Sequence, residues 1–170
     1  GIVGKNNRGT ITGCTMTGST VTAKNMLAGG ITGISEYGKV VGCLVVGGNI
    51  TAEVISGDNY SGRNVGGIVG NPSYGNTMVG CIGAPDKVSG KTNVGVVAGY
   101  NPSSGTLSNS FWSATAELDK AVGSGTMTGG GQFAKADMES TNGSFFTTVF
   151  SGGQTPIQLM NAALASHGVQ

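Results

Sequence analysis

The chain has 170 residues, of which 33 are glycine, 38% are apolar and only 10% are charged, and its net charge is +1. With four prolines and no three-residue glycine period it is not collagen, and its low charge does not fit a disordered chain. No run of Lys or Arg offers a footprint for nucleic acid, and no apolar stretch is long enough for membrane insertion. The composition favours an extracellular all-β protein.

A glycine-rich apolar hexapeptide recurs over positions 1–112. It reads VGGIVG at 65–70, AGGITG at 28–33 and VGVVAG at 94–99, with a truncated GIVG at 1–4. Repetition at a fixed interval is the sequence signature of stacked repeat architectures. The copies end at Gly4, Gly33, Gly70 and Gly99, which gives a period of about 29 residues with a longer middle interval.

A second pattern follows each copy and reports the same period. It reads GTITGC, GKVVGC, GNTMVGC and GTLSNS, and its copies end at Cys14, Cys43, Cys81 and Ser110. The middle interval is again the longest, which indicates an insertion of roughly nine residues, and we place it around Val54–Arg63.

Within each repeat, apolar residues alternate with small or polar ones over short runs, which predicts strands of about 3–5 residues between glycine-rich turns. Such short strands bury a core only by stacking turn upon turn, so equivalent side chains should form ladders. We predict an all-β fold, a parallel β-solenoid (β-helix-like) of about four ~29-residue coils over residues 1–118. Glycines should occupy corners that need a positive φ or close backbone approach. The expected ladders are Ile2, Ile31, Ile68 and Val97; Ile11, Val40, Met78 and Leu107; and Val21, Ile50 and Val88.

Residues 119–170 have a different pattern and predict a capping segment over the open end of the stack. A helix is expected near residues 156–166, because Thr155 suits the N-cap, Pro156 the first turn and Gln158 a capping box. Residues 132–139 predict a second, shorter helix.

The paired glycine-rich patterns, which recur once per repeat over positions 1–112, resemble the GLUG motif. That motif recurs in bacterial surface proteins, including adhesin-like proteins of gut Bacteroidetes and repeat regions of IgA-specific metallopeptidases. The resemblance implies a structural repeat without catalytic residues of its own.

Three cysteines in one repeat column admit three interpretations. Zinc ligands normally occur in close pairs, whereas each of these cysteines is a whole repeat away from the next. Stacked neighbours would lie within disulfide range, but their side chains would point the same way and one would remain. The third interpretation, a column of small buried thiols in the core, is the one we favour.

No catalytic or metal-binding constellation emerges, and we expect neither enzymatic activity nor a cofactor. The chain has one histidine, His167, near the end of the predicted C-terminal helix, and no His-Glu-x-x-His pattern. Its eight acidic residues fall in different repeat columns, whereas glycoside hydrolysis requires two neighbouring carboxyl groups.

Four tyrosines form the best candidate for a binding edge, since exposed tyrosines often anchor ligands or partners. Packing of turns against neighbouring turns is the alternative. Two of them adjoin Asn-Pro-Ser, at 71–73 and 101–103. The four are Tyr37, Tyr60, Tyr74 and Tyr100.

We therefore expect a non-catalytic structural or adhesion module of a bacterial cell-surface or secreted protein, located outside the cell. Its partner would be a host glycan, a host protein or another domain of the same chain. The alternative is an accessory repeat region of a secreted peptidase or glycan-processing enzyme. Since the chain opens within a repeat, we expect an excised fragment or a processed chain.

Overall fold

A computed structural model describes residues 1–139, 143–149 and 151–169 of the chain. Strands dominate this part of the chain, and every strand pair in it is parallel. The few helices all lie toward the C-terminus. The predicted all-β class with parallel sheets is thus confirmed.

The strands form four sheets, which we name A to D. Sheet A contains β1 (Val3–Asn7), β6 (Thr32–Glu36), β11 (Val69–Ser73), β16 (Ala98–Tyr100) and β18 (Val122–Ser124). Sheet B contains β2 (Thr10–Thr12), β7 (Lys39–Val41), β12 (Thr77–Val79), β17 (Thr106–Trp112), β13 (Ile82–Ala84), β8 (Leu44–Val46), β3 (Thr15–Thr17) and β19 (Thr128–Gln132). Sheet C contains β4 (Thr20–Ala23), β9 (Asn49–Ala52) and β14 (Lys87–Ser89). Sheet D contains β5 (Ala28–Gly29), β10 (Arg63–Gly66) and β15 (Thr92–Gly95).

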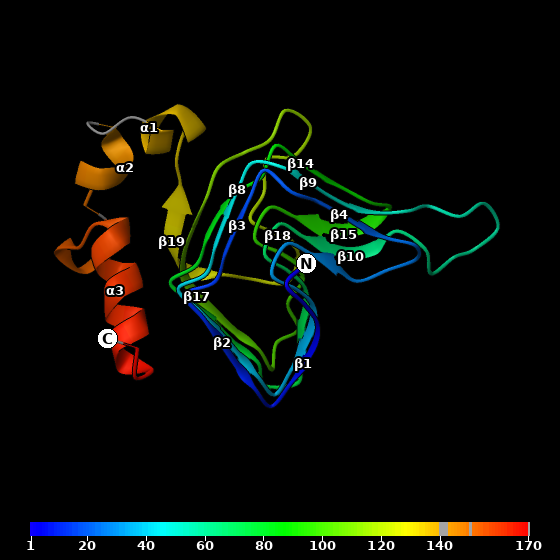
Figure 1. Cartoon of the computed structure of the whole chain (residues 1–170), viewed down its shortest axis with the longest axis horizontal. Helices are drawn as coiled ribbons and strands as arrows, with labels where there is room; N and C mark the ends of the chain where they lie inside the picture. Colours follow the sequence, from blue (N-terminus) through cyan, green and yellow to red (C-terminus); the bar gives the residue numbers. More distant parts are fainter. Residues whose placement is uncertain (140–142, 150, 170) are drawn as a thin grey trace.

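Strands pair with their counterparts one repeat away, in the register that the sequence predicts. In sheet B, Ile11 lies opposite Val40, Val40 opposite Met78, and Met78 opposite Leu107. In sheet C the column runs through Val21, Ile50 and Val88. Figure 1 shows the result, since equivalent strands of successive repeats lie over one another.

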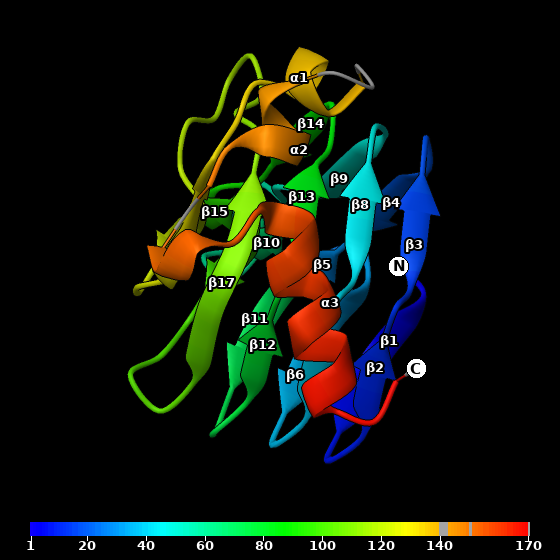
Figure 2. The same cartoon turned by 90° about the vertical axis from the view of Figure 1, so that its left-hand side faces the viewer.

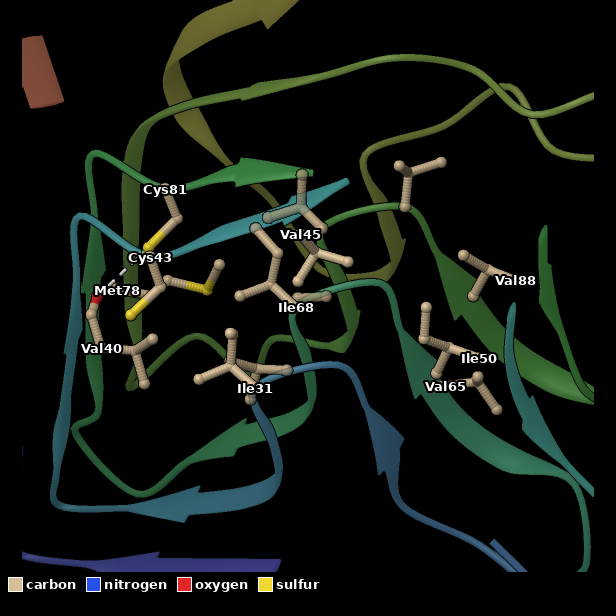
Figure 3. Close-up of a cluster of buried hydrophobic side chains, with 14 of the residues drawn as sticks. Ile31, Val40, Cys43, Val45, Ile50, Val65, Ile68, Met78, Cys81 and Val88 are labelled. Carbon is tan, nitrogen blue, oxygen red and sulfur yellow. Dashed lines mark hydrogen bonds between the residues drawn. The ribbon is translucent and has the colours of Figure 1, made fainter. Parts of the chain in front are cut away.

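The sheets enclose one continuous apolar core. Ile31, Ile68 and Val97 are fully buried, and backbone hydrogen bonds from Ile31 N to Ile68 O and from Ile68 N to Val97 O link them. Ile2, the fourth member of this predicted ladder, is 49% exposed because it belongs to the outermost repeat. Figure 3 shows the core side chains meeting between the strands.

The sharp bends between strands are stacked in columns of residues with a left-handed backbone. The bend between β2 and β3 uses Gly13, and its counterparts in the next two repeats are Gly42 and Gly80, with φ near 60° in each. Glycine adopts this conformation without a steric penalty. These bends therefore recur at the repeat period.

The glycines of the hexapeptide do not have a positive φ. They allow neighbouring backbone segments to approach one another closely. A Cβ on Gly70 would lie 2.5 Å from Gly33 O and 2.8 Å from Asn64 O, and one on Gly99 would lie 2.5 Å from Gly70 O. Backbone of sheets A and D meets here with no room for side chains. Gly4, in the outermost repeat, has nothing within 4 Å of this position.

The expected insertion is present between β9 and β10, as a loop projecting sideways from the stack (right in Figure 1). Ser61 organises it from inside, since its Oγ accepts a hydrogen bond from Ile55 N at 2.8 Å and donates to Asp58 O at 3.1 Å. The loop leaves the pairing of the flanking strands intact.

Both helices expected in the C-terminal segment are found, as α1 (Lys135–Glu139) and α3 (Pro156–Ser166), together with α2 (Ser144–Thr147) and the 3-10 turn η1 (Ser151–Gly153). Thr155 caps α3 in the predicted capping box with Gln158.

Two features of the C-terminal segment differ from expectation. β18 and β19 pair with β16 and β17, so the sheets extend past residue 118. The helices lie beside sheet B (Figure 2), whereas the sequence predicts a cap over the end.

The C-terminal helices lie beside the stack because the outer face of sheet B is apolar and packs against them. Ile82 and Phe111 face away from the main core and pack with Phe133 and Phe145 in a second buried cluster. An ion pair between Lys135 and Asp86 adds to this contact, and the hydrogen bond from Lys135 lowers the pKa of the Asp86 carboxyl. Among the described helices, none combines the length and apolar character that crossing a membrane demands.

Candidate functional site

Two of the four candidate tyrosines form a stacked pair on the edge between sheets A and B. The rings of Tyr37 and Tyr74 lie 5.8 Å apart at an interplanar angle of 19°, and both side chains are more than half exposed. The guanidinium of Arg8, one repeat earlier, lies 5.5 Å from the centre of the Tyr37 ring. We call these three residues the tyrosine column.

The backbone of this column is unusual. Arg8, Tyr37 and Tyr74 follow β1, β6 and β11, and their φ angles are 60°, 51° and 50°. A bulky residue in this region is a conformational outlier, at a cost on the order of 1–3 kcal/mol. The bend between β2 and β3 achieves a similar φ with glycine. Retaining long side chains where glycine would be unstrained is a reason to look here for function.

A cavity of about 290 Å³ adjoins the column on the outer face of sheet A. Tyr74 and Tyr100 lie in its wall together with residues from β6 and β11. We call it the tyrosine cavity; its lining is Ile34, Glu36, Asn71, Ser73, Tyr74, Tyr100, Pro102 and Ser104.

The wall contains polar atoms that the protein itself leaves unpaired. Ser73 is 6% exposed, yet its Oγ has no hydrogen-bond partner, and neither has the buried Oδ1 of Asn71. An unpaired buried polar group costs about 1–3 kcal/mol. The Glu36 carboxylate, also in the wall, pairs with Lys5 Nζ at 2.7 Å. The cavity is therefore mixed in character, with aromatic surface, neutral polar groups and one compensated charge.

A larger, more open cavity of about 470 Å³ lies where β17 and β19 lead into α1, lined by Ser113, Ala114 and residues 132–135. None of its described wall residues carries an unpaired buried polar atom. This cavity has space for a ligand but no unpaired buried polar atom that a ligand could satisfy. The tyrosine cavity is therefore the better candidate for a binding site.

Tyr60 does not join the other three tyrosines. It lies in the insertion between β9 and β10, is 64% exposed, and packs beneath the Arg63 guanidinium at 5.0 Å. The predicted edge of four tyrosines therefore divides into Tyr74 and Tyr100 in the cavity wall, Tyr37 stacked on Tyr74, and Tyr60 apart from them.

The cysteine column lies inside the stack, and its three thiols are free. Cys43 and Cys81 are fully buried, whereas Cys14 is partly exposed. Burial raises the pKa of the Cys81 thiol, and it also raises the pKa of Cys14. Ser110 takes the fourth place, where its Oγ accepts a hydrogen bond from Cys81 N at 3.2 Å. Figure 3 shows Cys43 and Cys81 stacked among core residues, so this column belongs to the core.

Other titratable groups do not assemble into a centre. Across residues 1–139, 143–149 and 151–169, no three His, Cys, Asp or Glu side chains are placed to hold a metal ion. The Nδ1 of His167 lies 2.9 Å from Ala163 O at the end of α3. Glu117, in the repeat column of Val88, pairs with Lys87 on the surface at 3.4 Å.

The polar cavity residues Glu36, Asn71 and Ser73 are absent from the sequence-based candidates. A signal for two of them was present, because Asn-Pro-Ser precedes Tyr74 and recurs after Tyr100. That pattern could not show that the side chains on either side of Pro72 line one cavity together with Pro102 and Ser104.

Comparisons with known protein families, with characterised proteins and with solved structures give no match for this chain.

Proposed function

We propose that this chain is a non-catalytic adhesion or structural module of a bacterial cell-surface or secreted protein, with its repeats forming a GLUG-like parallel β-solenoid. The observation that carries the proposal is the register of sheet A. Val3, Thr32, Val69, Ala98 and Val122 pair in succession, each with its counterpart in the next repeat. In a scaffold built this way the core residues are alike from repeat to repeat, whereas the residues of the turns can differ.

The shape of the described stack supports a binding role. Sheet A has five strands, and at ~4.8 Å per strand these five span about 20 Å. The view down the shortest axis shows the strands superposed, so the block is broader than it is deep (Figure 1). Such a block presents broad lateral faces to a partner.

The chemistry of the best cavity supports a non-catalytic role. Glu36 is the one carboxylate in its wall, and Lys5 neutralises it. Hydrolysis of a glycoside by the usual route needs two carboxyl groups about 5–10 Å apart. Stacked aromatic side chains with neutral polar neighbours are typical of binding surfaces.

The proposal is tested with the intact chain coupled to beads. We expect retention on immobilised mucin or extracellular-matrix protein above that of beads carrying serum albumin, with no product released from peptide or polysaccharide substrates. Turnover of a substrate would instead favour the accessory-enzyme alternative. Absence of retention on every surface would contradict an adhesion role.

A further inference from the structure

The tyrosine cavity combines features that specify a ligand class. On the protein side, Asn71 Oδ1 can only accept a hydrogen bond, whereas the Ser73 hydroxyl can donate or accept. Both atoms are buried and unpaired. Native proteins rarely leave such groups unsatisfied, and each instance calls for an explanation. Because both atoms are buried, a ligand hydroxyl reaches them only once the side chains turn toward the cavity; it can then donate to the amide oxygen or accept from the serine.

The remaining wall is apolar or aromatic. The rings of Tyr74 and Tyr100 and the side chains of Ile34 and Pro102 provide this surface. The Tyr74 ring is held in place by its stacking on Tyr37 at 5.8 Å. A rigid aromatic ring offers a large contact area at low entropic cost. The ligand should therefore have one apolar face in addition to its hydroxyl groups.

The charge of the cavity wall further restricts the class of ligand. The Glu36 carboxylate is already paired with Lys5 Nζ at 2.7 Å, and Glu36 is the only ionisable wall residue besides the two tyrosines. Within this wall, a phosphate or carboxylate ligand would thus meet an acidic side chain and no cation. The volume of about 290 Å³ is at the lower limit for small-molecule sites, which suits a single ring.

We propose that the tyrosine cavity binds one neutral pyranose ring of a saccharide. In this arrangement a tyrosine ring packs against the C–H face of the sugar, and the rim hydroxyls bond to Asn71, Ser73 and Glu36. The inference depends on the proposed adhesion function, of which it would be the recognition step.

The test uses the intact chain and a panel of methyl glycosides of glucose, galactose, mannose and N-acetylglucosamine, with methyl glucuronide as the charged comparison. Binding is measured by titration calorimetry and saturation-transfer NMR. We expect at least one neutral glycoside to bind and the glucuronide to bind more weakly. Failure of all neutral glycosides, or preference for the glucuronide, would overturn the assignment.

Variants separate recognition from folding. Ser73→Ala removes an unpaired buried hydroxyl, so its thermal stability should be unchanged or higher, while affinity falls about three- to tenfold with the lost hydrogen bond. Tyr100→Ala should weaken binding more than Tyr100→Phe. Tyr60→Ala, at an exposed tyrosine outside the cavity, is the matched control and should bind like the unmodified chain.

The outcomes also distinguish this inference from the broader proposal. Beads that adhere equally well with Ser73→Ala and Tyr100→Ala, and that no neutral glycoside displaces, would overturn the sugar site and leave adhesion standing. Beads that fail to adhere while the glycoside still binds would overturn the adhesion proposal and leave the sugar site standing. Displacement by tyrosine-containing peptides in place of sugars would assign the cavity to a protein ligand and overturn the inference.

Discussion

Gly70 and Gly4 occupy the same place in the repeat, yet their surroundings differ completely. A Cβ on Gly70 would collide with backbone oxygens of three segments, whereas one on Gly4 would meet nothing within 4 Å. Backbone cannot move aside as a side chain can. We therefore expect Gly70→Ala to lower the free energy of unfolding by about 3 kcal/mol or more.

Gly4→Ala is the matched control, and its effect should stay within about 0.5 kcal/mol. Both values come from denaturant unfolding followed by circular dichroism. Equal effects of the two substitutions would show that the close approach of sheets A and D is not the reason why position 70 requires glycine.

The cysteine column allows a second test at the residue scale. Thiol reagents attack the thiolate, and Cys81 and Cys43 are fully buried whereas Cys14 is partly exposed. We expect one thiol to be labelled in the folded protein and all three after denaturation. Because burial and the neighbouring Cys43 raise the pKa of Cys14, its labelling rate should still be increasing at pH values where an ordinary thiol has levelled off.

Mass spectrometry of the labelled protein identifies the site, and Cys14→Ser should abolish native-state labelling. Reaction of Cys81 in the folded protein would be incompatible with its place in the core.

At the scale of elements, the C-terminal helices depend on sheet B for their position. Phe145 is 2% exposed, and its ring lies 4.5 Å from Phe133 and 6.4 Å from Phe111. Phe145→Ala should destabilise this packing by roughly 3–5 kcal/mol. Because sheet B has its own inner core, hydrogen exchange should accelerate in α3 and remain slow in β7, β8 and β12.

Phe146 provides a control of the same residue type at the next position, since it is 39% exposed. Phe146→Ala should cost less than about 1 kcal/mol. If Phe145→Ala accelerated exchange equally throughout the sheets, the helices and the stack would form one cooperative unit.

At the scale of the whole molecule, the insertion is the longest interruption of the repeat period between β4 and β17. Deleting residues 54–61 would leave four residues between Ala52 and Val65, as between Ala23 and Ala28 in the preceding repeat. Loop length contributes little to stability. We expect the shortened chain to keep its circular dichroism spectrum and to unfold within about 1 kcal/mol of the original.

An equal-length deletion of residues 44–51 is the control, because it removes β8 and most of β9. That variant should lose cooperative unfolding. A collapse of the 54–61 variant as well would mean that the loop itself holds sheets C and D together.

Over residues 1–118, the sequence by itself determined the strands, their period and their partners. Parallel in-register stacking places residues one repeat apart side by side, so spacing alone identifies neighbours such as Ile11, Val40 and Met78. The capping box of α3 was equally predictable, because capping depends on residues within one helical turn.

Only the tertiary structure decided where the C-terminal helices lie and which polar residues meet in the tyrosine cavity. Their lateral position depends on Ile82 and Phe111, which face outward from sheet B. The cavity brings Asn71 and Ser73 together with Pro102 and Ser104 in one wall, and Tyr60 is not part of it. Periodicity specifies which residues stack, whereas the direction of each bend and what packs outside the stack depend on contacts between segments that share no period.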